Sequence, residues 1–487
     1  MHYLCHFMTG LVLLVLSVRG IALHDGFPKD RRYLEERDGI TYHIVEHART
    51  ATKLSFVTNS GICETTAGVN QYSGYLTVNA LNVFFWFFEA RHNPASSPLV
   101  MWLNGGPGCS SMMGLFVEHG PCTFPPGQTE PQLNPFSWNT VANMLYIDQP
   151  AETGFSYGPN NVTTTSKASD IIWIFTQIFY DSFPQYQNRN FSLFTESYGG
   201  HFGPAIIENF HRKNTAIDHG HLPGSYKIPV VSLGINNAWL DPVTQYRSYL
   251  TFALNNTYRP LLNISTFLPA LDKYTEDCLP QIQNCTATTG DPSNCSLAID
   301  VCYISTAYQV EQLQLRSVDG GFNQYDIRQP ADDVIPPDMF VSYLNRDEVK
   351  ISIGVPVKMG FVGCLESISD RFEESGDQAR SFLGQLGEVV RMGVNVLVWA
   401  GDADWVCNWM GNFDLIQGIN FPNQQEFVNK PVVPFTVNGQ VYGEYKTVNN
   451  LSWLRVYNSG HMVPYYQPLM SLQVFTQAIY GVPIYST

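Results

Sequence analysis

Ser197 stands in a sequence context that is typical of a catalytic serine. It lies in Thr195-Glu196-Ser197-Tyr198-Gly199-Gly200, directly after the apolar run Phe191-Ser192-Leu193-Phe194. A short strand that ends in a turn of small residues around a serine can form a nucleophile elbow, in which a strained strand-to-helix turn exposes the hydroxyl. Thr195 takes the place of the first glycine in the usual G-x-S-x-G pattern. The motif predicts a nucleophile that needs an acid and a base from elsewhere in the chain.

Two distant segments can supply that acid and base. They are Gly401-Asp402-Ala403-Asp404 and Gly460-His461-Met462-Val463-Pro464, and both follow the serine in the chain. A serine hydroxyl attacks efficiently only when a histidine accepts its proton and a carboxylate orients that histidine. The order nucleophile, acid, histidine is that of α/β-hydrolases. His461 is the predicted base and the acid is Asp402 or Asp404; we favour Asp404, because hydrolase acids commonly lie in G-x-x-D loops.

A glycine-rich segment could stabilise the negative charge that such a reaction creates. Trp102-Leu103-Asn104-Gly105-Gly106-Pro107-Gly108-Cys109-Ser110-Ser111 begins at the end of the apolar run 98–103. Glycines after a strand let backbone N–H groups approach a substrate closely, as an oxyanion hole requires. A plain glycine turn would have the same composition. Because this segment follows a predicted strand and lies one strand end away from the nucleophile elbow, the oxyanion hole is the favoured interpretation.

Short apolar runs and helical patterns alternate around these motifs. Runs of buried-strand type occupy 83–88, 98–103, 144–147, 191–194, 228–233, 394–399 and 453–457, and helical spacing marks 166–180 and 468–479. This alternation predicts an α/β protein with a doubly wound, mostly parallel sheet. Residues 241–375 interrupt it, are rich in Asn, Thr, Pro and Cys, and are interpreted as an inserted cap. We expect a signal peptide at 1–22, a first core part at 23–240, the cap at 241–375 and a second core part at 376–487.

Charge and the N-terminal segment limit the possible partners and location. The chain has 27 basic and 42 acidic residues, a formal charge of −15, and no basic cluster, so a nucleic acid is not an expected partner. The apolar stretch within residues 1–22 is typical of a secretory signal and is too short for a membrane span; a buried strand is the alternative. We therefore expect a secreted or vacuolar protein without a membrane span in the mature chain.

Seven Asn-x-Ser/Thr sequons agree with passage through the secretory pathway. The predicted glycosylation sites are Asn161, Asn190, Asn255, Asn263, Asn284, Asn294 and Asn450.

Taken together, the motifs resemble the serine carboxypeptidase family. The resemblance rests on 102–111, 196–200, 401–404 with Cys407-Asn408-Trp409, and 460–464 with Pro468. Ile62-Cys63-Glu64-Thr65-Thr66, the stretch 84–91 and Thr195 look like the fungal carboxypeptidase S1 branch. The resemblance implies the α/β-hydrolase fold and a serine-type carboxypeptidase that releases single amino acids from peptide and protein C-termini through an acyl-enzyme. It implies no cofactor and no metal.

The resemblance also implies roles for individual residues. The triad would be Ser197, Asp404 and His461, and the backbone N–H groups of Gly106 and Tyr198 would form the oxyanion hole. The C-terminal carboxylate of the substrate would be held by Asn104, the Gly105 backbone, Glu196 and Trp102, with Glu118 hydrogen-bonded behind Glu196. Met462 would line the pocket for the leaving residue and Tyr198 the pocket for the preceding residue, with Cys407 close to it. Core packing is the alternative for Trp102 and Met462, and a surface position is the alternative for Glu118.

Paired glutamates would make such an enzyme depend on pH. A carboxyl group can bind another carboxylate only when one of the two carries a proton. Two neighbouring acids that share a proton raise one pKa and turn that acid into a hydrogen-bond donor. An exopeptidase that recognises free C-termini in this way should work best in acid.

The cysteines indicate an oxidising compartment. Cys5 would leave with the signal, and the nine that remain imply one free thiol. Four of them are spaced 7, 10 and 7 residues apart, which suits nested loops. By resemblance the bridges would be Cys278–Cys302, Cys285–Cys295, Cys63–Cys122 and Cys109–Cys364, which leaves Cys407 free. A zinc site is the competing interpretation of the four spaced cysteines, and an oxidising compartment disfavours it.

Two other functions use the same features. A carboxypeptidase-like acyltransferase or esterase would have the same fold and triad. A non-catalytic protective or binding protein is the second alternative, although all three predicted triad positions are intact. The predicted set Asn104, Glu196 and Glu118 favours the peptidase.

Overall fold

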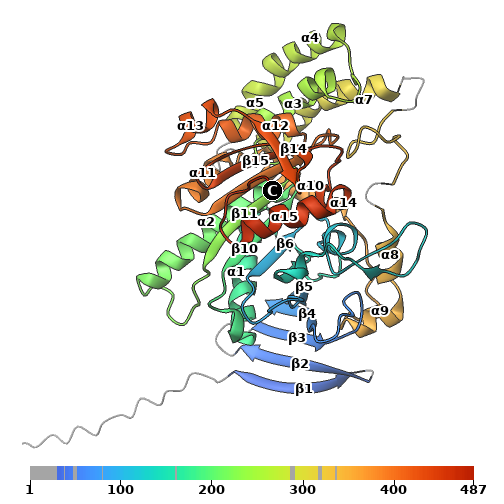
Figure 1. Ribbon diagram of the computed structural model, residues 1–487, viewed down its shortest axis with the longest axis vertical. Coiled ribbons are helices and arrows are strands. Elements are labelled where there is room, and N and C mark those ends of the chain that lie inside the picture. Colours follow the sequence, from blue (N-terminus) through green and yellow to red (C-terminus); the bar gives the residue numbers. More distant parts are fainter. Residues whose placement is uncertain are drawn as a thin grey trace, which may run out of the picture.

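A mixed sheet of 13 strands runs through the computed structural model (Figure 1). The structure describes residues 30–487 except 38, 48–51, 79, 160–161, 286–290, 316–320 and 335–336. The predicted signal peptide and the sequon at Asn161 lie outside the described residues.

The six central strands of this sheet are parallel. In sheet order they are β9 (Asn143–Ile147), β6 (Leu99–Leu103), β10 (Phe191–Glu196), β11 (Val230–Asn236), β12 (Asn395–Gly401) and β15 (Leu451–Val456). Each is almost wholly buried, which explains why these strands read as continuous apolar runs. The predicted strand runs at 98–103, 191–194, 228–233 and 394–399 fall in this parallel centre. The carboxyl ends of its strands carry the candidate site.

Antiparallel strands extend the sheet on both sides. On one side lie β1 (Arg31–Arg37), β2 (Ile40–His47), β3 (Thr52–Thr58), β4 (Gln71–Val78) and β5 (Leu81–Phe88); on the other lie β14 (Gln440–Val448) and β13 (Val433–Val437). Short connections between neighbours make antiparallel pairing the natural arrangement here, because a parallel neighbour needs a long crossover. The fold is therefore an α/β fold with a parallel centre and antiparallel flanks. A separate pair joins β7 (Cys122–Thr123) to β8 (Gln132–Leu133).

Helices cover both faces of the parallel strands. Side chains of α1 (Thr165–Ser182), α2 (Gly199–Asp218), α11 (Leu383–Arg391) and α12 (Trp409–Gln417) share one buried cluster with Leu99, Met101 and Leu103. The alternate residues Val100 and Trp102 pack on the other face, with η1 (Gly114–Glu118, a π-helical turn) and α15 (Pro468–Ile479). Alternation of side chains along a strand thus divides the core into two layers.

Most of the remaining helices lie between β11 and β12. They are α3 (Pro242–Asn255), α4 (Ile264–Lys273), η4 (Tyr274–Cys278), α5 (Leu279–Cys285), α6 (Pro292–Ser305), α7 (Ala307–Leu315), α8 (Met339–Leu344), α9 (Asp347–Ser352), α10 (Glu366–Glu374) and η5 (Asp377–Ala379). Helices α3 to α7 gather at one end of the molecule around a small core of their own, whereas α8 and α9 lie beside the antiparallel strands β3 to β5 (Figure 1). The inserted stretch therefore contacts two separate regions of the sheet domain. Shorter elements complete the chain: η2 (Trp138–Thr140), η3 (Pro184–Tyr186), α13 (Gln424–Asn429) and α14 (Val463–Tyr466).

Four disulfides join the same cysteines that the resemblance implied. They are Cys63–Cys122, Cys109–Cys364, Cys278–Cys302 and Cys285–Cys295. The last two form a nest that ties η4 and α5 to α6, and Cys407 is a buried free cysteine. These pairings exclude a tetrahedral zinc site at the nest.

The sequons differ in how accessible their side chains are. Asn190, Asn255, Asn263, Asn284 and Asn294 are exposed. Asn450 is half-buried, and its Nδ2 donates to the carbonyl oxygens of Val390 (2.9 Å) and Val394 (2.7 Å). A glycan on Nδ2 would remove one of these hydrogens, so the structure argues against the predicted glycan at Asn450.

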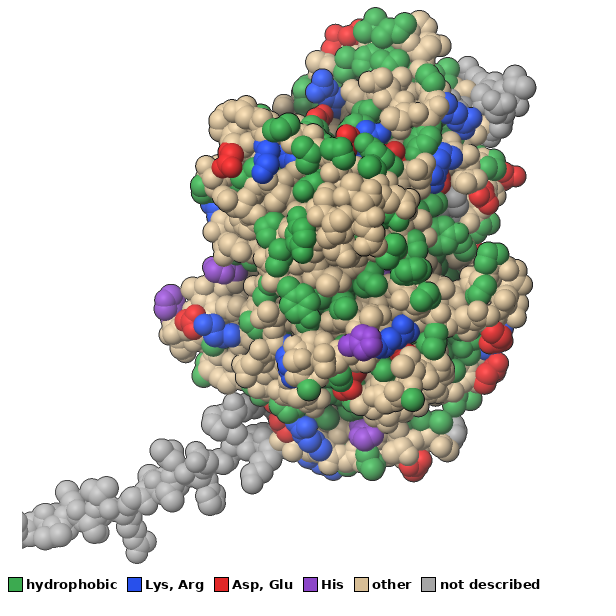
Figure 2. All heavy atoms as spheres, in the orientation of Figure 1, with side chains coloured by type: hydrophobic (Ala, Val, Ile, Leu, Met, Phe, Trp, Pro, Cys, Tyr) green, Lys and Arg blue, Asp and Glu red, His purple; other side chains and the backbone are tan. Residues whose placement is uncertain are grey.

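The surface carries few charged groups. On the face in Figure 2, Lys and Arg side chains are scattered, and apolar side chains gather at the end occupied by α4, where Ile264 and Leu268 are more than half exposed. Among the described residues, no helix is both long and apolar enough to cross a membrane.

Candidate active site

Ser197 occupies a sharp turn between β10 and α2. Its φ is +60°, a left-handed conformation that is costly for a residue with a side chain and that recurs at functional sites. Three backbone hydrogen bonds hold the turn: Ser197 N–H donates to the Asn236 carbonyl (3.0 Å), and the Trp239 and Gly200 N–H groups donate to the Ser197 carbonyl (2.8 and 2.9 Å). Thr195 fits the place of the usual glycine because its hydroxyl donates to the Gly199 carbonyl across the turn (2.9 Å).

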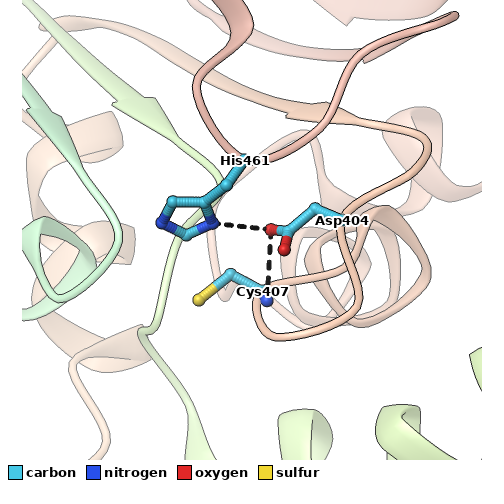
Figure 3. A group of neighbouring side chains, drawn as sticks. All are labelled: Asp404, Cys407 and His461. Atoms are coloured by element: carbon cyan, nitrogen blue, oxygen red, sulfur yellow. Dashed lines mark hydrogen bonds and ion pairs between the residues drawn. The ribbon is translucent and has the colours of Figure 1, made fainter. Parts of the chain in front are cut away.

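His461 pairs with Asp404 at the carboxyl ends of β15 and β12. The distance from His461 Nδ1 to Asp404 Oδ2 is 2.8 Å, and the other ring nitrogen points away from Asp404 (Figure 3). Burial disfavours the charged imidazole, but the charges of Asp404 and Glu196 outweigh this effect and raise the pKa of His461 above its ordinary value. The carboxylate also accepts hydrogen bonds from Val406 N–H, Cys407 N–H and the Asn237 side chain. These contacts orient it toward the histidine.

Asp402 faces a different part of the molecule. It accepts a hydrogen bond from the Tyr258 hydroxyl (2.5 Å) and lies 3.7 Å from the Arg455 guanidinium. Burial raises the pKa of Asp402 above its ordinary value. Of the two candidate acids, Asp404 is thus the one that contacts His461.

A cavity of about 100 Å³ opens beside the elbow. Its walls bring together Ser197, His461, Glu196, the glycine loop and Met462, together with Met113, Tyr325 and the Cys109–Cys364 disulfide. Gly105 packs so tightly against the elbow that a Cβ there would lie 2.4 Å from Tyr198 N and 2.6 Å from the Glu196 carbonyl. Gly106 has a φ of +103°. Among the residues that the structure describes, the N–H groups of Gly106 and Tyr198 donate to no backbone or side-chain acceptor, so both can serve a ligand.

Two carboxyl groups and two amides next to Ser197 form a buried carboxyl–amide cluster. Asn104 Nδ2 donates to Glu196 Oε1 (3.1 Å) and, more weakly, to Glu118 Oε1 (3.5 Å). Asn236 Nδ2 donates to the second oxygen of Glu196 (2.8 Å). Burial, and then the charge of Glu196, raises the pKa of Glu118 well above its ordinary value. Burial also raises the pKa of Glu196, against the opposing effects of His461, Glu118 and the two amides. At least one proton is therefore retained between the two acids.

Glu118 is almost completely buried, so the alternative of a surface carboxylate is wrong. It lies outside the cavity lining, which includes Glu196.

Trp102 does not reach the cavity, contrary to the prediction. Its indole N–H donates to Asn104 Oδ1 (2.7 Å), and the side chain is fully buried. That hydrogen bond, with one from Gly114 N–H to the same oxygen, orients the amide so that its NH₂ group faces the two glutamates. Trp102 thus positions Asn104 instead of contacting a substrate.

Tyr198 and Cys407 also lie outside the cavity lining. The Tyr198 hydroxyl donates to Asp377 Oδ2 (2.8 Å), and its ring stacks on His201. The Cys407 thiol lies beside the His461–Asp404 pair (Figure 3). Burial first, and the charge of Asp404 next, raise the pKa of Cys407 well above its ordinary value, with partial compensation by a hydrogen bond to Ser197. Met462 lines the cavity.

Sequence reasoning missed four residues of the site. Asn236 ends β11 and holds Glu196, and Asn237 follows it and holds Asp404. Met113 and Tyr325 line the cavity. The backbone N–H of His461 donates to the Tyr325 carbonyl (2.9 Å), and the Tyr325 ring packs edge-on against the imidazole. The adjacent asparagines at the carboxyl end of a predicted strand were the one available signal. Tyr325 lies in the inserted stretch, where the sequence pattern carries no comparable signal.

Known proteins match both this sequence and this fold. A sequence model of the serine carboxypeptidase family covers residues 62–481. The chain belongs to the serine carboxypeptidase family. It is similar to carboxypeptidase S1 of Penicillium janthinellum, with 47% identity over 89% of this chain and 100% of that protein. It is also similar to carboxypeptidase S1 homolog A of Arthroderma otae, with 32% identity over 98% and 82% of the two chains. The fold resembles that of Kex1(delta)p, a prohormone-processing carboxypeptidase from Saccharomyces cerevisiae, with a TM-score of 0.71, 23% identity and coverage of 88% and 93%.

Proposed function

We propose that this serine carboxypeptidase removes single amino acids from free peptide C-termini, with Ser197, His461 and Asp404 as its triad. The observation that carries the proposal is the buried cluster of Asn104, Glu196 and Glu118 directly beside the elbow serine. A site for a free carboxylate next to a nucleophile restricts cleavage to the last peptide bond.

The chemistry follows from the arrangement around Ser197. The hydroxyl attacks the last peptide carbonyl while His461 accepts its proton, and Asp404 fixes the imidazole tautomer through Nδ1. The N–H groups of Gly106 and Tyr198 stabilise the oxyanion. His461 then protonates the leaving amine and a free amino acid departs. His461 next deprotonates a water molecule, and this water hydrolyses the acyl-enzyme.

The C-terminal carboxylate is recognised without a basic side chain. Asn104 can exchange its weak hydrogen bond to Glu118 for one to the substrate, and the Gly105 backbone lies on the same wall. Protonated Glu196 donates a hydrogen bond to the carboxylate. Because the pKa values of Glu196 and of Glu118 behind it are both raised, the pair retains a proton for this bond. The amino acid that leaves lies against Met462 and Met113.

Matched peptides test this function. A peptide with a free C-terminus and the same peptide with a C-terminal amide are incubated with the enzyme, and the released amino acids are identified over time. We expect sequential release of single residues from the acid and much slower cleavage of the amide. Internal fragments, or equal rates for the two peptides, would contradict carboxylate recognition. Fluorophosphonate labelling followed by peptide mapping identifies the nucleophile independently.

We also propose that the chain passes through the secretory pathway to an extracellular or vacuolar destination. The four disulfides support an oxidising compartment, and the exposed sequons at Asn190, Asn255, Asn263, Asn284 and Asn294 are accessible to glycosylation. Residues 241–375 are proposed as the cap between core parts 23–240 and 376–487. The separate buried cluster of α3 to α7 supports this division.

A further inference from the structure

Asp377 occupies a buried position between three parts of the chain. Its carboxylate accepts hydrogen bonds from Thr165 N–H (3.0 Å), the Thr165 hydroxyl (2.5 Å) and the Tyr198 hydroxyl (2.8 Å). Thr165 begins α1, Tyr198 directly follows Ser197, and Asp377 itself belongs to η5, just after the inserted stretch 241–375. All three residues are at most 5% exposed. Hydrogen bonds from neutral donors to a buried carboxylate are stronger than those between neutral groups.

The disulfide nest fixes the backbone of Asp377. Gly376 has a φ of +71°, and a Cβ there would lie 2.7 Å from the Cβ of Cys295. Arg380, three residues after Asp377, donates to the carbonyl oxygen of Cys285 (3.1 Å). The cysteines of the inner bridge therefore touch the turn that carries Asp377 on both sides.

Ring packing and the hydrogen bond to Asp377 together restrain the Tyr198 side chain. Its ring stacks on His201 with the centroids 4.4 Å apart and meets Phe202 and Phe372 edge-on. Because the hydroxyl lies at the far end of the side chain from the backbone, its bond to Asp377 restrains rotation of the whole residue. The backbone nitrogen of the same residue lies against Gly105 of the cavity wall, where an added Cβ would lie 2.4 Å from it.

We propose that Asp377 is a positioning residue that holds the oxyanion-hole N–H of Tyr198 in place and links it to the disulfide nest. The inference rests on the proposed function. It assigns a contribution to transition-state binding to a residue of the segment between β11 and β12 that touches neither the substrate nor the triad. Ground-state recognition of the C-terminus, which uses Asn104 and Glu196, should not depend on it.

The test is a double-mutant cycle of Tyr198→Phe and Asp377→Asn with two inhibitors. A peptide aldehyde forms a hemiacetal whose oxygen occupies the oxyanion hole, whereas a free amino acid product occupies the carboxylate site. Loss of a complete oxyanion donor costs about 100- to 1,000-fold in kcat, so a misaligned donor should cost about tenfold. We expect each single variant to lose about tenfold in kcat and in aldehyde affinity, with KM and product affinity within twofold. The double variant should lose no more than the worse single variant, because both remove the same contact.

Matched controls keep the outcomes separate. Tyr226→Phe removes another tyrosine–aspartate hydrogen bond, to Asp181 (2.9 Å), between two residues that do not line the cavity, and should change none of these values. If Asp377→Asn does not fold, Tyr198→Phe alone decides, because it removes only a hydroxyl. Unchanged kcat and aldehyde affinity in Tyr198→Phe, or equal losses for aldehyde and product, would overturn the inference. Failure of the proposed function itself would show as a wild-type enzyme that fluorophosphonate does not label.

Discussion

Replacing Glu196 by glutamine should flatten the pH dependence of peptide binding. A substrate carboxylate that accepts from Asn104 would lie about 4 Å from Glu196, and two like charges at that distance repel by about 4 kcal/mol at an effective dielectric constant of 20. That energy corresponds to a loss of about a thousandfold in affinity. Peptides therefore bind the form with protonated Glu196, and KM should rise about tenfold per pH unit above the pKa of that group. Glutamine donates at every pH, so this slope should be close to zero in Glu196→Gln.

The substitution has a cost of its own at low pH. Both oxygens of Glu196 accept amide hydrogens, from Asn104 and Asn236, and glutamine offers only one oxygen. The NH₂ group of the glutamine would then face the NH₂ group of Asn104 or Asn236, at a cost of about 1 to 3 kcal/mol. We expect KM at acid pH to rise about tenfold, near the lower end of that range. The assay is KM for a peptide acid and its C-terminal amide across the pH range.

Two comparisons make this prediction refutable. Glu64→Gln changes another buried acid, which pairs with Arg91 outside the cavity lining, and should leave the slope unaltered. In Glu196→Gln the pKa of His461 should fall, because the charge of Glu196 helps to raise it. His461 must be neutral to act as a base, so the acid limb of kcat/KM should move to lower pH. Equal slopes of KM for the wild type and Glu196→Gln would refute the reasoning.

Three further predictions concern the proposed triad and its neighbour. Ser197→Ala should leave a folded protein whose kcat is lower by about four orders of magnitude or more; residual activity above a few per cent would remove Ser197 from the mechanism. Asp404→Asn should lower kcat by about 10⁴, because the imidazole loses its orienting acceptor, whereas Asp402→Asn should act mainly on thermal stability; the reverse order would contradict the assignment. Native protein should react slowly with maleimide at Cys407, since the thiol is buried and its pKa is raised, and modification should abolish activity by crowding His461; peptide mapping with timed activity assays checks this, and rapid labelling or full activity after labelling would speak against it.

Residues in local motifs were the predictable part of the site. Ser197, His461 and the glycine loop each lie at the end of a buried parallel strand, where apolar runs and turn residues are visible in the sequence. The parallel centre of the sheet was predictable for the same reason. Of the antiparallel flank, only β5 was predictable, since it contains the apolar run 83–88. Strands β1 to β4 were not, because they mix apolar and polar residues without a regular pattern.

Side-chain direction was beyond sequence reasoning. Trp102 was expected at the substrate and instead holds Asn104, and Tyr198 was expected in a substrate pocket and instead bonds Asp377. Both partners are set by packing between segments that are far apart in the chain. Tyr325 and Asp377 illustrate the same limit, since they come from the mainly helical segment between β11 and β12, which has no recognisable periodic pattern.

The bridge between Cys109 and Cys364 connects positions 255 residues apart and forms part of the cavity wall. We therefore expect the activity of each molecule to depend on whether this disulfide formed during its production. A preparation made in a reducing bacterial cytosol should contain chains whose glycine loop is no longer tethered to the inserted stretch, and such chains would be poorly active even where the rest of the fold had formed. Recombinant production should accordingly use an oxidising compartment, and specific activity should track the fraction of chains in which this crosslink is closed.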